Sequence, residues 1–382
     1  MTAPASPAPS PPARTQQLVL LGAGHAHLQV LIQLAAQPLP GTAVILVTPH
    51  PGQLHSNMVP GFAAGHYTLD NCTTALEPLV QRSGIRWIQR SAIGVDAQNQ
   101  SIQLDDGSTL PFDWLSVNTG TVQDRDKLER NMPGAREHGL FLRPVEAFCA
   151  LWPRVVELGN TRPLRIAVLG TDAAGVELAL ATRHRLPSAA VTLVCGKEPP
   201  GANFPPAVQH RLLAVLKKRK VTLLQDVALS LTAQAIQLGC GADLACDVPL
   251  LATRTLAPSW LAGSGLALDA QGFLAVDMYQ RSTSHSRVFA AGGVSKRADH
   301  PLARGSAHSA RAGTSLAFNL AAAITGAALK PYKPSGRHLH LLSCGGKYAV
   351  ASWGGFSAQG RWVWWLKNWM DRRFVARFSR AG

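Results

Sequence analysis

The feature that most constrains the fold of this chain is a unit that occurs twice, with Gly22 and Gly170 at matching places 148 residues apart. Each copy has a short apolar run, a glycine turn, a helical pattern and a second apolar run. The first copy reads QLVLLGAGHAHLQVLIQLAAQPLPGTAVILV (17–47), and the second reads LRIAVLGTDAAGVELALATRHRLPSAAVTLV (164–194). Strand, helix and strand in this order form a parallel sheet. The duplication therefore predicts an α/β chain with two Rossmann-like dinucleotide-binding domains.

The first glycine turn is a candidate phosphate site. Gly22 and Gly24 fall where the first strand should turn into the helix, and a helix N-terminus presents unpaired N–H groups and partial positive charge. A full GxGxxG pattern would place glycine at position 27, where this chain has His27, and His25 lies in the same turn. Thr48 follows the second strand, where an acid often holds the ribose, and its hydroxyl offers a weaker bond.

The second glycine turn keeps Gly170 and Gly175, but Asp172 stands where a second glycine would let the backbone approach a diphosphate. A carboxylate repels the phosphates. We therefore expect this half to bind its nucleotide weakly or not at all.

A third strand, turn and helix pattern follows in RVFAAGGVS (287–295) and SAHSARAGTSLAFNLAAAI (306–324). Gly292 and Gly293 imply a close approach of the backbone, either to a cofactor or in tight helix packing.

The C-terminal segment RWVWWLKNWMDRRFVARFSR (361–380) predicts an amphipathic helix. Its expected apolar face comprises Trp362, Trp365, Leu366, Trp369, Met370 and Phe374, and its expected cations are Lys367, Arg372, Arg373 and Arg377. Tryptophan and arginine on one helix suit an anionic membrane surface. Packing on the chain itself or on a partner in a homodimer is the alternative. We expect no nucleic-acid partner, because no nucleic-acid motif accompanies the helix.

Charge and composition limit the setting. Lys and Arg number 37 against 22 acids, a formal net charge of +15, which favours a polyanionic partner. Six cysteines without CxxC spacing indicate a reducing compartment and no metal site. Residues 1–16 are rich in proline and lack a secretory signal, so a disordered tail is expected. No run of about 18 apolar residues occurs, so membrane contact should be peripheral, at the inner face of the cytoplasmic membrane.

The motifs GAGHAH, NMVPG, VNTGT, VLGTDAAGVELAL, GFLAVD, VFAAGGVS and WVWWLKNWMDRRF together resemble the FAD-dependent pyridine nucleotide-disulfide oxidoreductase superfamily. Within it, the chain is similar to the NADH-dehydrogenase-like flavoprotein that some bacteria fuse to selenide, water dikinase, here without the kinase domain. More distantly it resembles single-subunit NADH:quinone and sulfide:quinone oxidoreductases. The resemblance covers roughly residues 17–378.

The resemblance implies an FAD domain built from both ends of the chain, an inserted NAD(P)H domain and a membrane-facing C-terminal helix. We place the FAD domain at 17–150 and 259–330, the NAD(P)H domain at 151–258 and the C-terminal region at 331–382. The residues that the resemblance assigns to FAD are Gly22, Gly24, His25 and His27 at the diphosphate, Thr119 and Gly120 against the cofactor, and the loop 57–61 near the isoalloxazine.

Three positions depart from the family pattern. Gly293 replaces an acid that usually binds the ribityl chain, and Arg254 replaces a glycine after the second nucleotide unit. Arg143 stands where the family often has a lysine. The resemblance implies that Arg143 pairs with Glu177, as a lysine and a glutamate do beside the flavin in related enzymes, unless both are ordinary surface and helix residues.

The leading prediction is a peripheral membrane flavoprotein that takes a hydride from NAD(P)H onto FAD and passes electrons to a quinone or another acceptor. The first alternative is a degenerate family member that serves as a membrane-associated binding or regulatory protein, motivated by Asp172, Arg254 and Gly293. A second alternative, oxidation of a sulfur or selenium compound, rests on the family resemblance alone.

Overall fold

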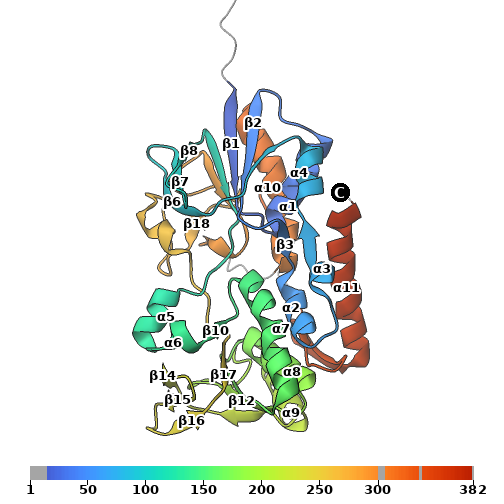
Figure 1. Ribbon diagram of the computed structural model, residues 1–382. Helices are drawn as coiled ribbons and strands as arrows, with labels where there is room; N and C mark the ends of the chain where they lie inside the picture. The colour runs from blue at the N-terminus through green and yellow to red at the C-terminus, as the bar shows by residue number, and fades with distance from the viewer. Residues whose placement is uncertain (1–14, 300–305, 335–337, 381–382) are drawn as a thin grey trace, which may run out of the picture.

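Two parallel sheets of five strands form the frame of the molecule (Figure 1). The computed structural model describes residues 15–299, 306–334 and 338–380. The tail expected over 1–16 lies almost entirely outside these residues, because strand β1 begins at Gln16.

The first sheet uses strands from both ends of the chain, in the order β19-β9-β1-β2-β5. Its strands are β1 (Gln16–Leu21), β2 (Thr42–Val47), β5 (Arg86–Ile88), β9 (Trp114–Val117) and β19 (Val288–Ala290). Every neighbouring pair is parallel. The central strand β1 is buried on both faces, since Leu18 and Leu20 belong to one apolar cluster and Val19 and Leu21 to another. This explains its continuous apolar run.

The second sheet has the order β10-β17-β11-β12-β13, again with all pairs parallel, but its edge strand β10 precedes the other four in the chain, whereas β19 follows the other strands of the first sheet. Its strands are β10 (Leu140–Phe141), β11 (Arg165–Leu169), β12 (Ala190–Val194), β13 (Thr222–Leu224) and β17 (Val248–Leu251). Strands β11, β12 and β13 stand where β1, β2 and β5 stand in the first sheet. The predicted pair of Rossmann-like α/β units is therefore confirmed.

Helices cover these sheets and follow the predicted turns. Those that position the site are α1 (His25–Ala36), α2 (Val59–Ala63), α7 (Val145–Thr161), α8 (Ala173–Arg185), α10 (Ser306–Thr325) and α11 (Arg361–Arg380). Helices α1 and α10 cross so closely that a Cβ on Gly313 would lie 2.6 Å from the carbonyl oxygen of Ala26. This contact holds the start of α1 against the first sheet.

Smaller antiparallel elements complete the fold. They are β3 (Gly52–Leu54) with β4 (Thr73–Ala75), the meander β6 (Ala92–Asp96), β7 (Ser101–Leu104) and β8 (Thr109–Pro111), the meander β14 (Ala228–Leu231), β15 (Ala235–Leu238) and β16 (Asp243–Ala245), and the meander β21 (Leu339–Ser343), β22 (Ala349–Trp353) and β23 (Phe356–Gly360). Strand β23 leads directly into α11, which runs along one side of the molecule (Figure 1). No helix of the described residues is long and apolar enough to cross a bilayer.

Candidate active site

The residues predicted to hold FAD come together at the carboxyl end of the first sheet. Gly22 and Gly24 follow β1, Thr119 and Gly120 follow β9, and the glycine pair at 292–293 follows β19. Strands β19, β9 and β1 are consecutive in the sheet. The carboxyl edge of a parallel sheet is the ligand-binding edge of this architecture, and the assignment of this set to FAD stays a prediction.

Asn118 organises the turn, and the sequence analysis missed it. Its side-chain oxygen accepts hydrogen bonds from the N–H groups of Ala26 (3.1 Å) and His27 (3.2 Å), which caps α1. Its amide donates to the carbonyl of Ala291 at 2.6 Å, which ties the turn after β9 to that after β19. A Cβ on Gly24 would lie 2.3 Å from the Asn118 oxygen, so this glycine makes room for the cap. The available signal was a polar residue directly after the apolar run of β9.

The turn fits the diphosphate of FAD. Gly22 has φ +85°, and a Cβ there would lie 2.7 Å from the Cα of Thr119. The N–H groups of Ala23 and His25 have no acceptor among the described residues, as an anion site requires. A Cβ on Gly120 would meet only open space, which leaves room for a cofactor beside it.

Two other predicted residues have structural roles. The His27 side chain is fully buried, with Nδ1 2.5 Å from the carbonyl of Gly22 and Nε2 2.8 Å from the hydroxyl of Ser116. Burial lowers the pKa of His27 to about 4, so the ring is neutral. Its hydrogen bonds to Gly22 and Ser116 join the turn to β9. Thr48 is buried at the end of β2, and its N–H donates to the carbonyl of Ile88.

The glycines of the second turn serve packing between strand and helix. A Cβ on Gly170 would lie 2.3 Å from the carbonyl oxygen of Ala252, and one on Gly175 would lie 2.3 Å from that of Gly170. Asp172 precedes α8, and its carboxylate accepts a hydrogen bond from Asn203 at 2.7 Å. A negative charge therefore lies at the start of α8, as the sequence indicated.

The expected pair of Arg143 with Glu177 is not formed. The charged neighbour of Arg143 is Glu146, whereas Glu177 accepts a hydrogen bond from the N–H of Ser343 at 2.6 Å and has Lys367 as its cation. Burial raises the pKa of Glu177 to about 7, and the Lys367 charge opposes this rise. The predicted arginine is therefore replaced by a lysine from the far end of the chain.

Lys367 is itself buried, which corrects its expected place among the exposed cations of α11. Its Nζ donates to Asp371 (2.6 Å) and to the carbonyl of Asn57 (2.7 Å). Asn57 lies in a 3-10 turn (Ser56–Met58) that continues into α2, so residues 57–61 are helical and do not form the expected loop. Lys367 thus joins α11 to this segment and to Glu177 of α8.

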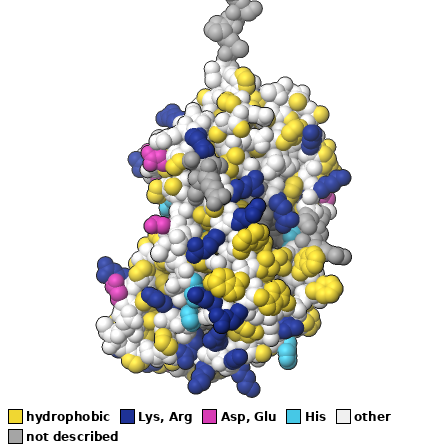
Figure 2. Space-filling view, turned by 90° about the vertical axis from the view of Figure 1, so that its right-hand side faces the viewer, with side chains coloured by type: hydrophobic (Ala, Val, Ile, Leu, Met, Phe, Trp, Pro, Cys, Tyr) yellow, Lys and Arg dark blue, Asp and Glu magenta, His cyan; other side chains and the backbone are white. Residues whose placement is uncertain are grey.

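The single apolar face expected for α11 is divided between its two sides. The inward side buries Val363, Trp364, Lys367, Asp371, Val375 and Phe378. The outward side exposes Trp362, Trp365, Trp369 and Met370, and Trp353 and Phe356 of the preceding hairpin are exposed as well. We call these six exposed residues the tryptophan face. Figure 2 shows hydrophobic side chains gathered on this side of the molecule, with Lys and Arg groups around them.

Reactive thiols are not available at this site. All six cysteines are free, and only Cys240 is exposed. Burial raises the pKa of Cys72 and Cys344 to about 12, so both stay protonated thiols near Lys367 and Glu177. The described residues include no group of three or more side chains able to hold a metal ion.

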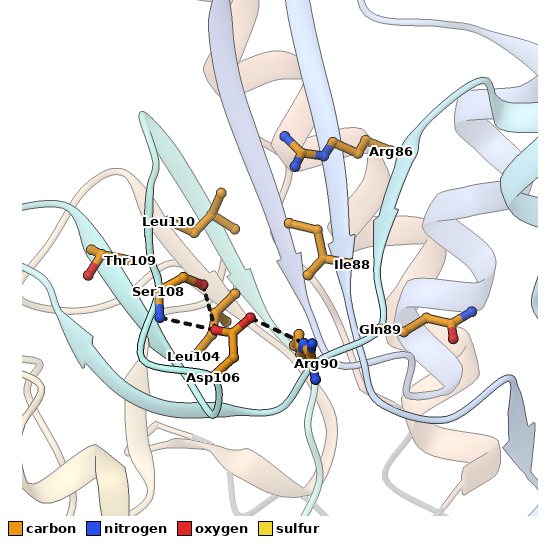
Figure 3. A pocket seen from close by; sticks show the side chains of 9 residues that line it. All are labelled: Arg86, Ile88, Gln89, Arg90, Leu104, Asp106, Ser108, Thr109 and Leu110. Carbon is orange, nitrogen blue, oxygen red and sulfur yellow. Dashed lines mark hydrogen bonds and ion pairs between the residues drawn. The ribbon is translucent and has the colours of Figure 1, made fainter.

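A cavity of about 720 Å³ lies elsewhere, between the end of β5 and the hairpin β7–β8 (Figure 3). Its lining residues are Arg86, Ile88, Gln89, Arg90, Leu104, Asp106, Ser108, Thr109 and Leu110. An ion pair between Arg90 and Asp106, 3.2 Å apart, spans part of it. It contains none of the residues described above and is separate from the candidate site.

Two Rossmann-like units, the first with a glycine turn that fits a diphosphate, are the architecture of oxidoreductases that use a flavin and a pyridine nucleotide. The chain belongs to the pyridine nucleotide-disulphide oxidoreductase family, whose model matches residues 16–317. It is therefore an FAD-dependent oxidoreductase of a family that uses NAD(P)H, as the sequence predicted.

The individual proteins that this chain resembles have low sequence identity to it. Ferroptosis suppressor protein 1 of Xenopus tropicalis is 24% identical over 307 residues, which cover 75% of this chain and 78% of that protein. The sulfide:quinone oxidoreductase of Aquifex aeolicus superimposes with a TM-score of 0.77 at 14% identity, covering 96% of this chain and 92% of the other. NDH2 of Plasmodium falciparum, solved with NADH, gives 0.78 at 12% identity, covering 96% and 98%. These solved structures confirm the fold.

Proposed function

We propose that this protein transfers electrons from NAD(P)H through FAD to a quinone at the surface of an anionic membrane. The observation that best supports this proposal is that the two sides of α11 differ in character. Its outward side carries three of the exposed tryptophans, and its inward side places Lys367 against Asp371 and beside Glu177. One helix thus joins a surface suited to lipid headgroups with a buried site of proton-carrying groups.

Different residues of the site would bind the cofactor, carry a proton and attract negative charge in such a reaction. FAD, when bound, supplies hydride acceptance and electron delivery. The turn after β1 would hold its diphosphate, and the open space beside Gly120 would admit the cofactor. Glu177, with a pKa of about 7, carries a proton near neutral pH, and the Lys367 ammonium attracts negative charge that develops on an acceptor.

Membrane attachment rests on the tryptophan face and on the basic balance of the chain. Aromatic rings at headgroup depth and cations facing lipid phosphates would bind the protein to the inner face of the cytoplasmic membrane. The same face could instead be covered in a homodimer, which remains a prediction. The closer resemblance to the flavoprotein fused to selenide, water dikinase also remains a prediction. A selenium or sulfur donor would need chemistry other than the protonated thiols of Cys72 and Cys344.

The absorption spectrum of the purified protein tests this function, followed by anaerobic addition of NADH or NADPH and then of a soluble quinone. We expect a flavin spectrum that bleaches with one of the nucleotides and returns with the quinone. A flavin that stays oxidised would point to another donor, in keeping with Asp172 at the start of α8. A protein without flavin would favour the degenerate binding protein.

A further inference from the structure

A continuous chain of buried polar groups connects the FAD turn to α11, and the function proposed above does not use all of it. His25 is the first residue of α1, and its Nε2 lies 3.0 Å from Nδ1 of His55. His55 Nε2 lies 3.4 Å from one oxygen of Asp371, and Lys367 Nζ lies 2.6 Å from the other. These four residues come from three separate parts of the sequence. We call them the buried polar chain.

Burial and stacking hold the buried polar chain in place. His25, His55, Lys367 and Asp371 are each at most 8% exposed. The Phe374 ring stacks on His55 at 4.6 Å and meets the edge of His25 at 5.1 Å. Buried polar groups keep such an arrangement only when each is hydrogen-bonded. Because its ring contacts both imidazoles, Phe374 separates them from solvent on the side of α11.

The distances fix a consistent set of proton positions. Asp371 is an anion, because Lys367 and His55 hold its pKa below the ordinary value. His55 then donates from Nε2 to Asp371, which leaves Nδ1 to accept from Nε2–H of His25. Burial, with the nearby His55 ring, lowers the pKa of His25, so that ring is neutral and its Nδ1 can accept a proton. His25 and His55 thus each donate toward Asp371, and Asp371 accepts from Lys367 with its other oxygen.

We propose that His25, His55 and Asp371 form a proton relay that leads from the FAD turn to Lys367 and Glu177. This inference rests on the proposed function, because reduction of a quinone by NAD(P)H consumes one further proton: NAD(P)H, quinone and H⁺ give NAD(P)⁺ and quinol. The nicotinamide hydride supplies two electrons and one proton. The Lys367 ammonium gives the second proton to the quinone, and Asp371 then returns a proton to Lys367 that it takes from His55, and His55 from His25. Lys367 stands at the delivering end beside Glu177, and His25, His55 and Asp371 carry the proton that replaces the one Lys367 gives.

Other titratable groups also face the relay and enter its pH dependence. Those that interact with Asp371 are Tyr67, Cys72, Glu177 and Lys367, and Arg372 acts on Tyr67 and Cys72 in turn. Burial raises the pKa of Tyr67 well above its ordinary value and the pKa of Cys72 to about 12, so neither changes protonation between pH 5 and pH 9. Glu177 titrates within that range and must be separated from the relay by experiment.

The first test measures which histidine nitrogens of the buried polar chain carry a proton, in the protein without turnover. Nitrogen-15 NMR of the protein labelled at histidine should show His55 with its proton on Nε2, and Asp371→Asn should shift that nitrogen and weaken the preference. His285→Gln is the matched control, because that ring hydrogen-bonds with the hydroxyl of the neighbouring Ser284 and lies outside the buried polar chain. A His55 protonated on Nδ1, or one insensitive to Asp371→Asn, would overturn the relay.

The second test separates the relay from the proposed function. In His55→Gln we expect anaerobic bleaching of the flavin by NAD(P)H at the wild-type rate, but recovery of the spectrum with quinone slower by roughly 100-fold. Added imidazole should restore part of that rate, and the solvent deuterium effect should rise. Quinone recovery at the wild-type rate would refute the relay even if the protein is a quinone reductase. If the wild type itself fails to reduce quinone, the proposed function falls, and the NMR result alone decides whether the relay exists.

Discussion

Replacing single residues of the tryptophan face should weaken vesicle binding without disturbing the fold. Trp362, Trp365 and Trp369 are 60%, 55% and 57% exposed. A tryptophan buries roughly 200 Å² when fully covered, so each ring leaves about 110 Å² free. At roughly 25 cal/mol per Å², complete transfer into lipid would contribute about 3 kcal/mol per ring. Partial insertion at headgroup depth recovers about half, or roughly tenfold in affinity for each Trp→Ala change.

Co-sedimentation with vesicles of phosphatidylcholine and phosphatidylglycerol measures this effect. The triple Trp→Ala variant should bind on the order of 10³-fold more weakly, and salt should weaken binding of the wild type. The matched control is Leu229→Ala, which removes a 45% exposed apolar side chain from β14 on the opposite side of the molecule from α11 (Figure 1). Equal losses in the control and in a single tryptophan variant, or wild-type binding by the triple variant, would refute the reasoning.

Three further predictions concern the interior. Glu177 has a pKa of about 7 against an ordinary 4.5, so the folded state holds its proton more tightly than the unfolded chain and loses stability as pH rises through this window. Urea unfolding should therefore show that the free energy of unfolding of Glu177→Gln, relative to that of the wild type, is higher at pH 7.5 than at pH 5 by on the order of 2 kcal/mol. The same difference between variant and wild type at both pH values would contradict this. Asp172→Gly should lower the KM for NADH about tenfold, whereas Asn203→Ala, which keeps the charge, should not. Asn118→Ala leaves two buried N–H groups of α1 unpaired and should cost about 1–3 kcal/mol in thermal unfolding, against little for the exposed Asn99→Ala.

The sequence predicted the parts of the fold that local patterns determine. Residues 16–47 and 164–194 form strand, helix and strand as expected, because their apolar runs are buried on both faces and their glycines meet neighbouring backbone. The turns after β1, β9 and β19 lie at one edge of the sheet as expected, since parallel strands place their carboxyl ends together, and their role in holding FAD stays a prediction.

The partners of the charged residues could not be predicted in this way. Periodicity identified α11 as a helix, but it assigned Lys367 to the exposed side, where a lone lysine would normally lie. Its burial depends on Asp371 one turn away and on the carbonyl of Asn57, 310 residues distant in the chain. The pairing of Glu177 likewise depends on where α11 docks, which no local pattern in residues 164–194 contains.

The two-sided character of α11 has a practical consequence for anyone who shortens the chain. Cutting before residue 361 would take away more than the proposed membrane contact, because it would also remove Lys367, Asp371 and the Phe374 ring that covers His55. Glu177 would lose its cation, and the carbonyl of Asn57 would lose the hydrogen bond from Lys367. We therefore expect such a truncated protein to leave vesicles because it lacks most of the tryptophan face, and to be inactive for the separate reason that it lacks Lys367 and Asp371. Attachment and turnover can be separated only by changing outward side chains one at a time.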